Sequence, residues 1–432
     1  MEAFFDWAER LVRAIPYLLL NPFYWVTIVL VALVYRRQSA LESKLFHVRL
    51  HRAGRETARA VGWGLAAGVG ASCVMIPLGV TLTPESAAVL LVIAAVLTFF
   101  RIRYLCFAYA TGLFGLMQWG LRYVPEPFAE REFVAPILRA IADTSVPSLL
   151  VLVAILHLAE AALVRREGAR AATPLFVESK RGKIVGAYQF YALWPVPLFL
   201  LVPASAFGVS GAPLPWQPPF ADGETAAWTL AALPAALGFA DRTVTRLPKS
   251  KARRSARRLA GYGVFMLAAA FAAARWEALL PVASILSFAL HEAIIVAGHR
   301  EEKKGAPLFL HDGKGLKILA VIPGSPAAKL GLMAGETIRK VNQEPVLTKE
   351  DLHRAMRLNP AYCRLEVLNL AGESKFVSTA LYADEHHQLG IVLAPDERAT
   401  HYVSDHPRHG HAIAFFRRKT FGLRQKGENA PG

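Results

Sequence analysis

Two histidine–glutamate pairs in apolar sequence are the residues whose types and spacing suit metal chemistry. The stretch His291-Glu292-Ala293-Ile294-Ile295 begins like the His-Glu-x-x-His zinc motif, whose two histidines lie one helical turn apart. Position 295 is isoleucine, however, and His299 lies more than two turns after His291. The sequence also lacks a Gly-x-Ser-x-Gly nucleophile elbow with its partners. We therefore predict a protein that is not an enzyme, with no catalytic residues, no metal ligands and no cofactor.

His157 and Glu160 make the other pair, and their spacing places both side chains on one helix face. A Glu-x-x-His pair can bind metal in a helix bundle, but here the order is reversed and no second matching pair exists. Ionisable groups in apolar segments need partners. We interpret His157, Glu160, His291 and Glu292 as groups that hydrogen-bond between helices, and a metal-binding role for them stays open.

Apolar sequence dominates the chain before about residue 300. Of the 432 residues, 54% are hydrophobic and 19% are charged. Apolar blocks of roughly 15 to 22 residues suit helices that cross a hydrocarbon layer. These blocks cover residues 15–35, 61–82, 87–100, 104–121, 146–164, 184–202, 226–240, 260–274 and 278–297. We predict an α-helical, multispanning integral membrane domain over residues 1–299, with about eight or nine transmembrane helices.

The basic residues indicate how this domain is oriented. The formal net charge is +16, and Lys and Arg cluster in alternate loops between the apolar blocks. By the positive-inside rule these loops are cytoplasmic, so the N-terminus is outside and everything after residue 299 is in the cytoplasm. Such loops also attract anionic lipid, and we prefer this interpretation to nucleic-acid binding. The cysteines, Cys73, Cys106 and Cys363, are far apart and indicate neither a disulfide framework nor a CxxC metal site.

A pattern typical of a water-soluble module follows residue 299. Its stretch PGSPAAKLGLMAGETIRKVN resembles the PDZ signature of bacterial proteins, with Glu336 and Gln343 as mild departures. The resemblance implies a small α+β PDZ domain over residues 305–395, and the polar, basic residues 396–432 predict a disordered tail. The elements predicted from the residues are strands at 316–321, 337–341, 364–368, 375–380 and 388–393, and an amphipathic helix at 349–358.

A PDZ domain binds a peptide as an added strand, and the resemblance implies an x-Leu-Gly-φ loop that holds the peptide carboxylate. The stretch His387-Gln388-Leu389-Gly390-Ile391 fits this loop but lies at the end of the module, which indicates a circularly permuted PDZ. The groove would lie between the strand after Leu389 and the helix at 349–358. The predicted peptide-binding residues are Gln388, Leu389, Gly390, Ile391, Leu352, His353 and Met356. The alternative is that QLGIVL is a closing strand without a ligand.

Three further stretches carry a resemblance in addition to the PDZ signature: LLNPFYWVTIVLVALVYRRQSALESKLFHVRL, PLFVESKRGKIVGAYQFYALWPVPLFLLVP and HEAIIVAGHREEKKGAPLF. With these stretches, the chain as a whole resembles the MinJ family of the Min cell-division system. The resemblance implies a non-enzymatic membrane scaffold at the septum and poles that bridges a DivIVA-like coiled-coil protein to a MinD-like ATPase. Other divisome proteins are possible further partners. The alternative is a membrane-embedded protease or protease regulator that uses its PDZ for substrate choice.

Overall fold

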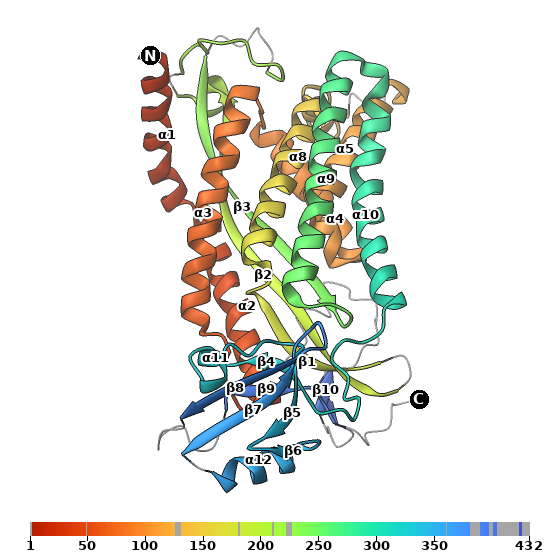
Figure 1. Cartoon of the computed structure of the whole chain (residues 1–432). Helices are drawn as coiled ribbons and strands as arrows, with labels where there is room; N and C mark the ends of the chain where they lie inside the picture. Colours follow the sequence, from red (N-terminus) through yellow and green to blue (C-terminus); the bar gives the residue numbers. More distant parts are fainter. Residues whose placement is uncertain are drawn as a thin grey trace.

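The computed structural model describes residues 2–48, 50–125, 131–179, 182–209, 211–221, 227–359, 361–380, 389–396, 401–403 and 423–425. Long helices fill one end of the molecule and a small sheet with two short helices forms the other end (Figure 1). A long β-hairpin runs from the small sheet upward among the helices (Figure 1). The expected division into a helical part and a C-terminal module is therefore visible, but the helical part contains strands.

The helical part is built around α8 (Val146–Leu163), whose side chains are buried along almost its whole length. Helix α8 packs against α3, α5 and α9. Prolines at the first turn and side-chain caps fix where several helices begin: Asn21 caps α2, Thr83 caps α4 and Ser145 caps α8. The other long helices are α1 (Glu2–Leu20), α2 (Pro22–Phe46), α3 (Ala53–Leu78), α4 (Pro84–Phe100), α5 (Phe107–Gly120), α7 (Ala135–Ala142), α9 (Pro248–Arg275) and α10 (Leu280–Lys304).

Three described helices are long and apolar enough to cross a membrane: Ala53–Leu78, Val146–Gly168 and Glu277–Lys304. The pair Glu9–Leu20 and Pro22–Phe46, which is bent by 66°, makes a fourth if it is one broken span. The helix Pro84–Phe100 is apolar but shorter. The boundaries at residues 299 and 395 stay predictions, but the total of about eight or nine spans loses two of its blocks, because residues 184–202 and 228–240 lie in strands.

Two apolar blocks that we expected as helices are strands. Residues 184–202 lie in β2 (Ile184–Pro203) and residues 227–240 of the other block largely in β3 (Trp228–Thr243), and the two strands pair antiparallel from Tyr188↔Thr243 to Pro203↔Trp228. Block length and hydropathy do not distinguish a buried strand from a helix. The prolines at positions 195 and 197 argue against a helix in the first block, because a proline inside a helix removes a hydrogen bond and clashes with the preceding turn. The helical expectation for these blocks was therefore wrong.

Helix α3 covers the proline-containing edge of β2. Strand β1 (Ala172–Glu178) pairs with β2 only as far as Phe190, so Pro195 and Pro197 lie where β2 has lost that neighbour. Gly64 and Gly68 of α3 contact this edge so closely that a Cβ would lie 2.2 Å from Pro195 O and 2.1 Å from Pro197 O. A one-turn glycine spacing therefore allows the helix to lie directly on the strand backbone.

The C-terminal module contains a six-stranded sheet with strand order β8-β7-β5-β4-β9, and β6 pairs with β5. The strands and the helix predicted between residues 316 and 380 are confirmed. Its core is formed by Ile318, Ile338, Val341, Leu365 and their buried neighbours. The elements are β4 (Leu316–Val321), α11 (Pro326–Lys329), β5 (Thr337–Val341), β6 (Glu344–Pro345), α12 (Lys349–Leu358), β7 (Tyr362–Leu368), β8 (Ser374–Ala380) and β9 (Ile391–Leu393).

The module is joined to the base of the hairpin. Gly186 N donates to Phe309 O at 2.9 Å, and the Tyr188 hydroxyl donates to Leu319 O. Phe309 and Leu319 belong to the same buried cluster as the helices. The structure thus has one continuous core that extends from the helical part into one face of the module.

Parts of the predicted disordered tail form strands. Strand β10 (His401–Val403) pairs parallel with β1 through Val177↔Val403, and β11 (Leu423–Gln425) pairs antiparallel with β10. The hairpin sheet therefore has the order β11-β10-β1-β2-β3. For these six residues the expectation of disorder was wrong; the others between residue 397 and the C-terminus lie outside the described residues.

Candidate functional site

One wall of the predicted groove is α12, whose start is fixed by its sequence. Asp351 N donates to Thr348 Oγ1 at 3.1 Å and Thr348 N donates to Asp351 Oδ2 at 2.9 Å, which is a reciprocal capping box. Hydrogen bonds from the side chain and backbone of Thr348 hold the pKa of the Asp351 carboxyl below its usual value. With this register Leu352 and Met356 are buried while His353 is exposed.

The opposite wall is the loop before β9. Gly390 has φ +75°, a left-handed conformation that favours glycine. Its carbonyl accepts from Ile322 N at 2.8 Å, and the carbonyl of Leu389 accepts from Ala327 N at 2.9 Å. These bonds hold the loop against the turn that caps α11, where Ser325 Oγ accepts from Ala328 N at 3.3 Å. Because β9 is the last strand of its sheet, one of its edges has no partner among the described strands.

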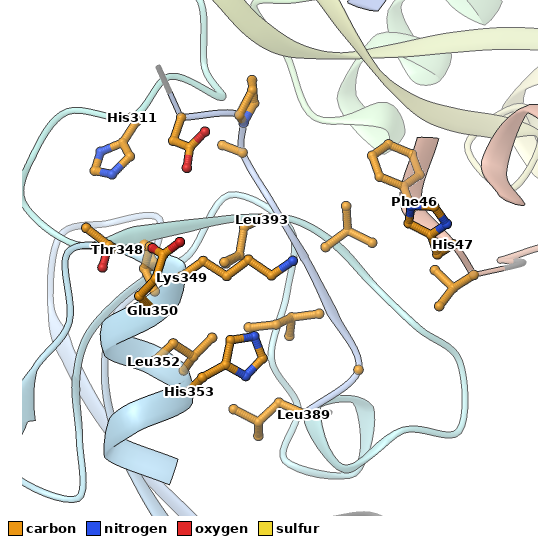
Figure 2. A pocket seen from close by; sticks show the side chains of 18 of the residues that line it. Phe46, His47, His311, Thr348, Lys349, Glu350, Leu352, His353, Leu389 and Leu393 are labelled. Carbon is orange, nitrogen blue, oxygen red and sulfur yellow. The ribbon is translucent and has the colours of Figure 1, made fainter. Parts of the chain in front are cut away.

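These walls enclose a cavity of about 750 Å³ (Figure 2). Six of the predicted peptide-binding residues line it, and the seventh, Gln388, lies outside the described residues. The side chains of Leu352 and His353 on α12 and of Leu389 point into the space beside β9 (Figure 2). The six lining residues are Leu352, His353, Met356, Leu389, Gly390 and Ile391.

Residues from the helical part line the same cavity, and no sequence pattern indicated them. Phe46, His47 and Val48 come from the end of α2, and Phe176 comes from β1. In Figure 2, Phe46 and His47 lie across β9 from α12. The chain reverses at His47, whose φ of 56° is left-handed. The contact joins segments some 300 residues apart, so local patterns do not report it. The cavity therefore lies at the junction of the two parts and not within the module alone.

The cavity is lined by buried apolar side chains and by polar side chains. Leu352, Met356 and Leu389 are buried beneath it. The polar lining consists of His47, His311, Thr348, Lys349, Glu350, His353 and Asp396. An unpaired strand edge beside an apolar floor suits an extended peptide, because the backbone supplies hydrogen bonds and the floor takes alternate side chains.

Three of the four ionisable residues singled out in the apolar blocks, His157, His291 and Glu292, contact other helical segments, as expected. The His157 ring lies 5.1 Å from the ring of His291, centroid to centroid. The Glu292 carboxylate accepts from Arg103 at 2.6 Å and from the Tyr109 hydroxyl at 2.8 Å. Cys106 lies between the two histidines. The spacing of these residues could not have shown this cluster, because they lie on segments that are far apart in the sequence.

Comparison with known proteins identifies both parts of the chain. A PDZ domain model matches residues 317–369, that is, β4 to β7. Over 404 residues, covering 92% of this chain and 98% of the relative, the sequence is 29% identical to the cell division topological determinant MinJ of Bacillus subtilis. The chain is similar to MinJ along nearly its whole length.

The probable MinJ proteins of Lacticaseibacillus paracasei and Lacticaseibacillus casei are each 28% identical over 261 residues, 60% of this chain and 69% of the relative. The predicted resemblance to MinJ is thus confirmed. The match to B. subtilis MinJ includes the helical part as well as the PDZ domain. The relatives are named as division determinants and not as enzymes.

Proposed function

We propose that this protein is a non-enzymatic membrane scaffold of the Min system. In this proposal it bridges a polar and septal coiled-coil protein of the DivIVA type to a MinD-type ATPase, and so places the division inhibitor and the septum. The observation that carries the proposal is the similarity to MinJ along nearly the whole chain. A scaffold needs several weak contacts at one membrane site, and a membrane anchor raises their effective concentration.

The PDZ groove is proposed as one of the partner sites. A partner segment would add to the free edge of β9 and place side chains over Leu352 and Met356, in a circularly permuted PDZ whose carboxylate loop contains Gln388, Leu389 and Gly390. This use is supported by the cavity and by the strand order, in which β9 closes the sheet next to α12. Because Phe46 and His47 line the same cavity, peptide binding would also contact the helical part.

The helical part is proposed to cross the cell membrane with the PDZ domain on the cytoplasmic side. Candidate spans and the basic clusters beside them support this orientation. Some of the basic residues have structural partners, however. Lys251 is buried and pairs with Asp241 at 3.1 Å and with Glu302 at 3.3 Å. Exposed cations such as Lys249 and Arg253 are the ones available to anionic lipid.

A single pair of substitutions tests the groove. His353 lines the cavity, whereas its exposed neighbour Arg354 pairs with Asp351 outside it. We expect His353→Ala to weaken one pairwise interaction in a two-hybrid assay against the DivIVA-type and MinD-type proteins of the same organism. Arg354→Ala should leave every interaction unchanged. If neither partner responds to His353→Ala while both bind the wild type, the groove is not the site.

Localisation tests the scaffold itself. A fluorescent fusion of the full chain should concentrate at septa and poles, and a uniform membrane signal would favour a membrane protease or protease regulator instead. A reporter that is active only in the cytoplasm, fused after Gly432, should be active. Activity only with a reporter that works outside the membrane would exclude contact with cytoplasmic division proteins.

A further inference from the structure

A thiol and two imidazoles converge inside the helical part. Cys106 precedes α5 as its N-cap residue, His157 is on α8 and His291 is on α10. Cys106 Sγ lies 3.5 Å from His157 Nε2 and 3.7 Å from His291 Nε2. Both histidines are buried, with 2% and 8% of their surface exposed. Three ligand-type atoms thus lie within 4.8 Å of one another.

The hydrogen bonds on the far side of each ring fix which nitrogens face the thiol. His157 Nδ1 lies 2.8 Å from Val153 O, an atom that only accepts, so Nδ1 carries the proton and Nε2 presents a lone pair. The Tyr109 hydroxyl donates to Glu292, so it accepts from His291 Nδ1 at 3.2 Å. His291 Nε2 therefore also presents a lone pair to Cys106.

One thiol proton cannot satisfy two lone pairs. In a cluster of neutral groups, Cys106 donates to one Nε2 and leaves the other without a donor among its described neighbours. A cation at the centre satisfies all three atoms at once. Its binding releases the thiol proton and leaves a thiolate and two neutral imidazoles as ligands.

The two sulfur–nitrogen separations match those of a zinc site. With Zn–S near 2.3 Å and Zn–N near 2.0–2.1 Å, tetrahedral geometry separates sulfur and nitrogen by roughly 3.6 Å. The two observed separations, 3.5 and 3.7 Å, lie on either side of that value. Thiolate and imidazole both bind zinc, and a set of two histidines and one cysteine also occurs in copper sites, so the metal itself has to be identified by experiment.

The surroundings also have the organisation of a metal site. His291 is oriented by Tyr109, which is held by Glu292 and, through Glu292, by Arg103. The Tyr262 ring lies 4.7 Å from the His157 ring and 5.6 Å from the His291 ring, centroid to centroid. Partners of this kind fix the tautomer and orientation of metal-binding histidines.

We propose that Cys106, His157 and His291 bind a zinc ion that clamps the start of α5 to α8 and α10. Three protein ligands leave a fourth tetrahedral position for water. The site is separate from the PDZ groove and does not depend on the proposed Min function. It also revises the expectation from the sequence that no residue binds metal.

The test uses the full chain in detergent, purified without a nickel column or chelators. Elemental analysis should find about one zinc per chain. Cys106→Ser and His291→Gln should each lose most of it. Cys73→Ser and His299→Gln, which change an exposed cysteine and an exposed histidine of the same part, should retain it.

Cobalt substitution adds a readout on the wild-type protein itself, which does not depend on whether a variant folds. Cobalt(II) bound to the wild-type protein should show a thiolate-to-cobalt charge-transfer band, which Cys73→Ser retains and Cys106→Ser loses. A wild-type protein with neither zinc nor this band would show a hydrogen-bonded Cys–His cluster only. Retention of copper in place of zinc would overturn the assignment of the metal.

Discussion

Gly390 lies directly against Ser325: a Cβ at position 390 would lie 2.1 Å from the Ser325 Cβ. Ser325 Oγ donates in turn to Gly390 O at 3.3 Å. This contact joins the loop before β9 to the turn before α11, and the position of β9 beside α12 depends on it. The glycine is therefore required by close contact as well as by its φ of +75°.

Gly390→Ala should destabilise the PDZ domain more than an equivalent change elsewhere. Gly372 is the matched control, because its φ is +85° but nothing lies within 4 Å of a Cβ there. Gly372→Ala should cost about 1–2 kcal/mol, the cost of the left-handed conformation. Gly390→Ala should cost more, measured as the shift of the thermal unfolding midpoint. Equal shifts would mean that the loop moves away from Ser325 without cost.

Gly68→Ala should separate α3 from the hairpin. A Cβ at this position would lie 2.1 Å from Pro197 O, whereas Gly70 in the same helix has nothing within 4 Å. Gly70→Ala should stabilise the chain by up to about 1 kcal/mol, because alanine is the better helix former. We expect Gly68→Ala to lower the unfolding midpoint instead. A rise for both variants would contradict the close helix–strand contact.

Lys375 neutralises a buried carboxylate. Its Nζ donates to Glu336 Oε1 at 2.9 Å, and the Glu336 side chain is 1% exposed. Lys375→Met should cost about 3–5 kcal/mol, because the carboxylate stays buried without its cation. The control is Lys340→Met, because Lys340 is 47% exposed and its pair with Glu366 should contribute no more than about 1 kcal/mol. Chemical denaturation of both variants measures the difference, and equal losses would refute the buried-pair interpretation.

Stability should fall as the pH rises above neutrality, because of His51. Burial lowers the pKa of this imidazole, but its hydrogen bond to Glu42, the charge of Glu42 and the bond to Arg170 O outweigh burial and raise the pKa overall. A raised folded-state pKa gives stability that is complete below the unfolded value near 6.5 and is lost as the pH passes the folded value. The unfolding midpoint of the wild type should therefore drop over this window.

Two variants test this pH dependence: His51→Gln removes the titrating group, and His299→Gln is the control. His51→Gln should flatten the profile, because it removes the group that titrates between Glu42 and Arg170. His299→Gln, at an exposed position, should retain the wild-type slope. An unchanged slope in His51→Gln would assign the effect to another group.

Local patterns predicted the C-terminal module almost completely. The capping box at Thr348 and Asp351 and the turn at Gly335 mark where α12 and β5 begin. Hydropathy led to a wrong prediction of helices for β2 and β3, because a hydrophobic block is compatible with a buried strand as well as with a membrane helix. Pro195 and Pro197 were the signal that would have corrected the prediction.

The residues of the two candidate sites also differ in whether the sequence predicted them. Residues 389–391 and α12 were predicted because each lies in a recognisable local motif. Cys106 is separated from His157 by 51 residues and from His291 by 185. The groove wall at Phe46 likewise depends on how the helical part meets the PDZ domain. Such contacts exist only after the chain has folded, so no spacing rule reports them.

Strand β10 lies beside β1, although more than two hundred residues separate them in the chain. The ribosome therefore releases β1 long before its neighbour has been made. Until residues 401–403 have been made, the β1 side of the hairpin sheet has an open backbone edge. A message truncated just after the PDZ domain would yield a polypeptide whose first sheet can never be completed.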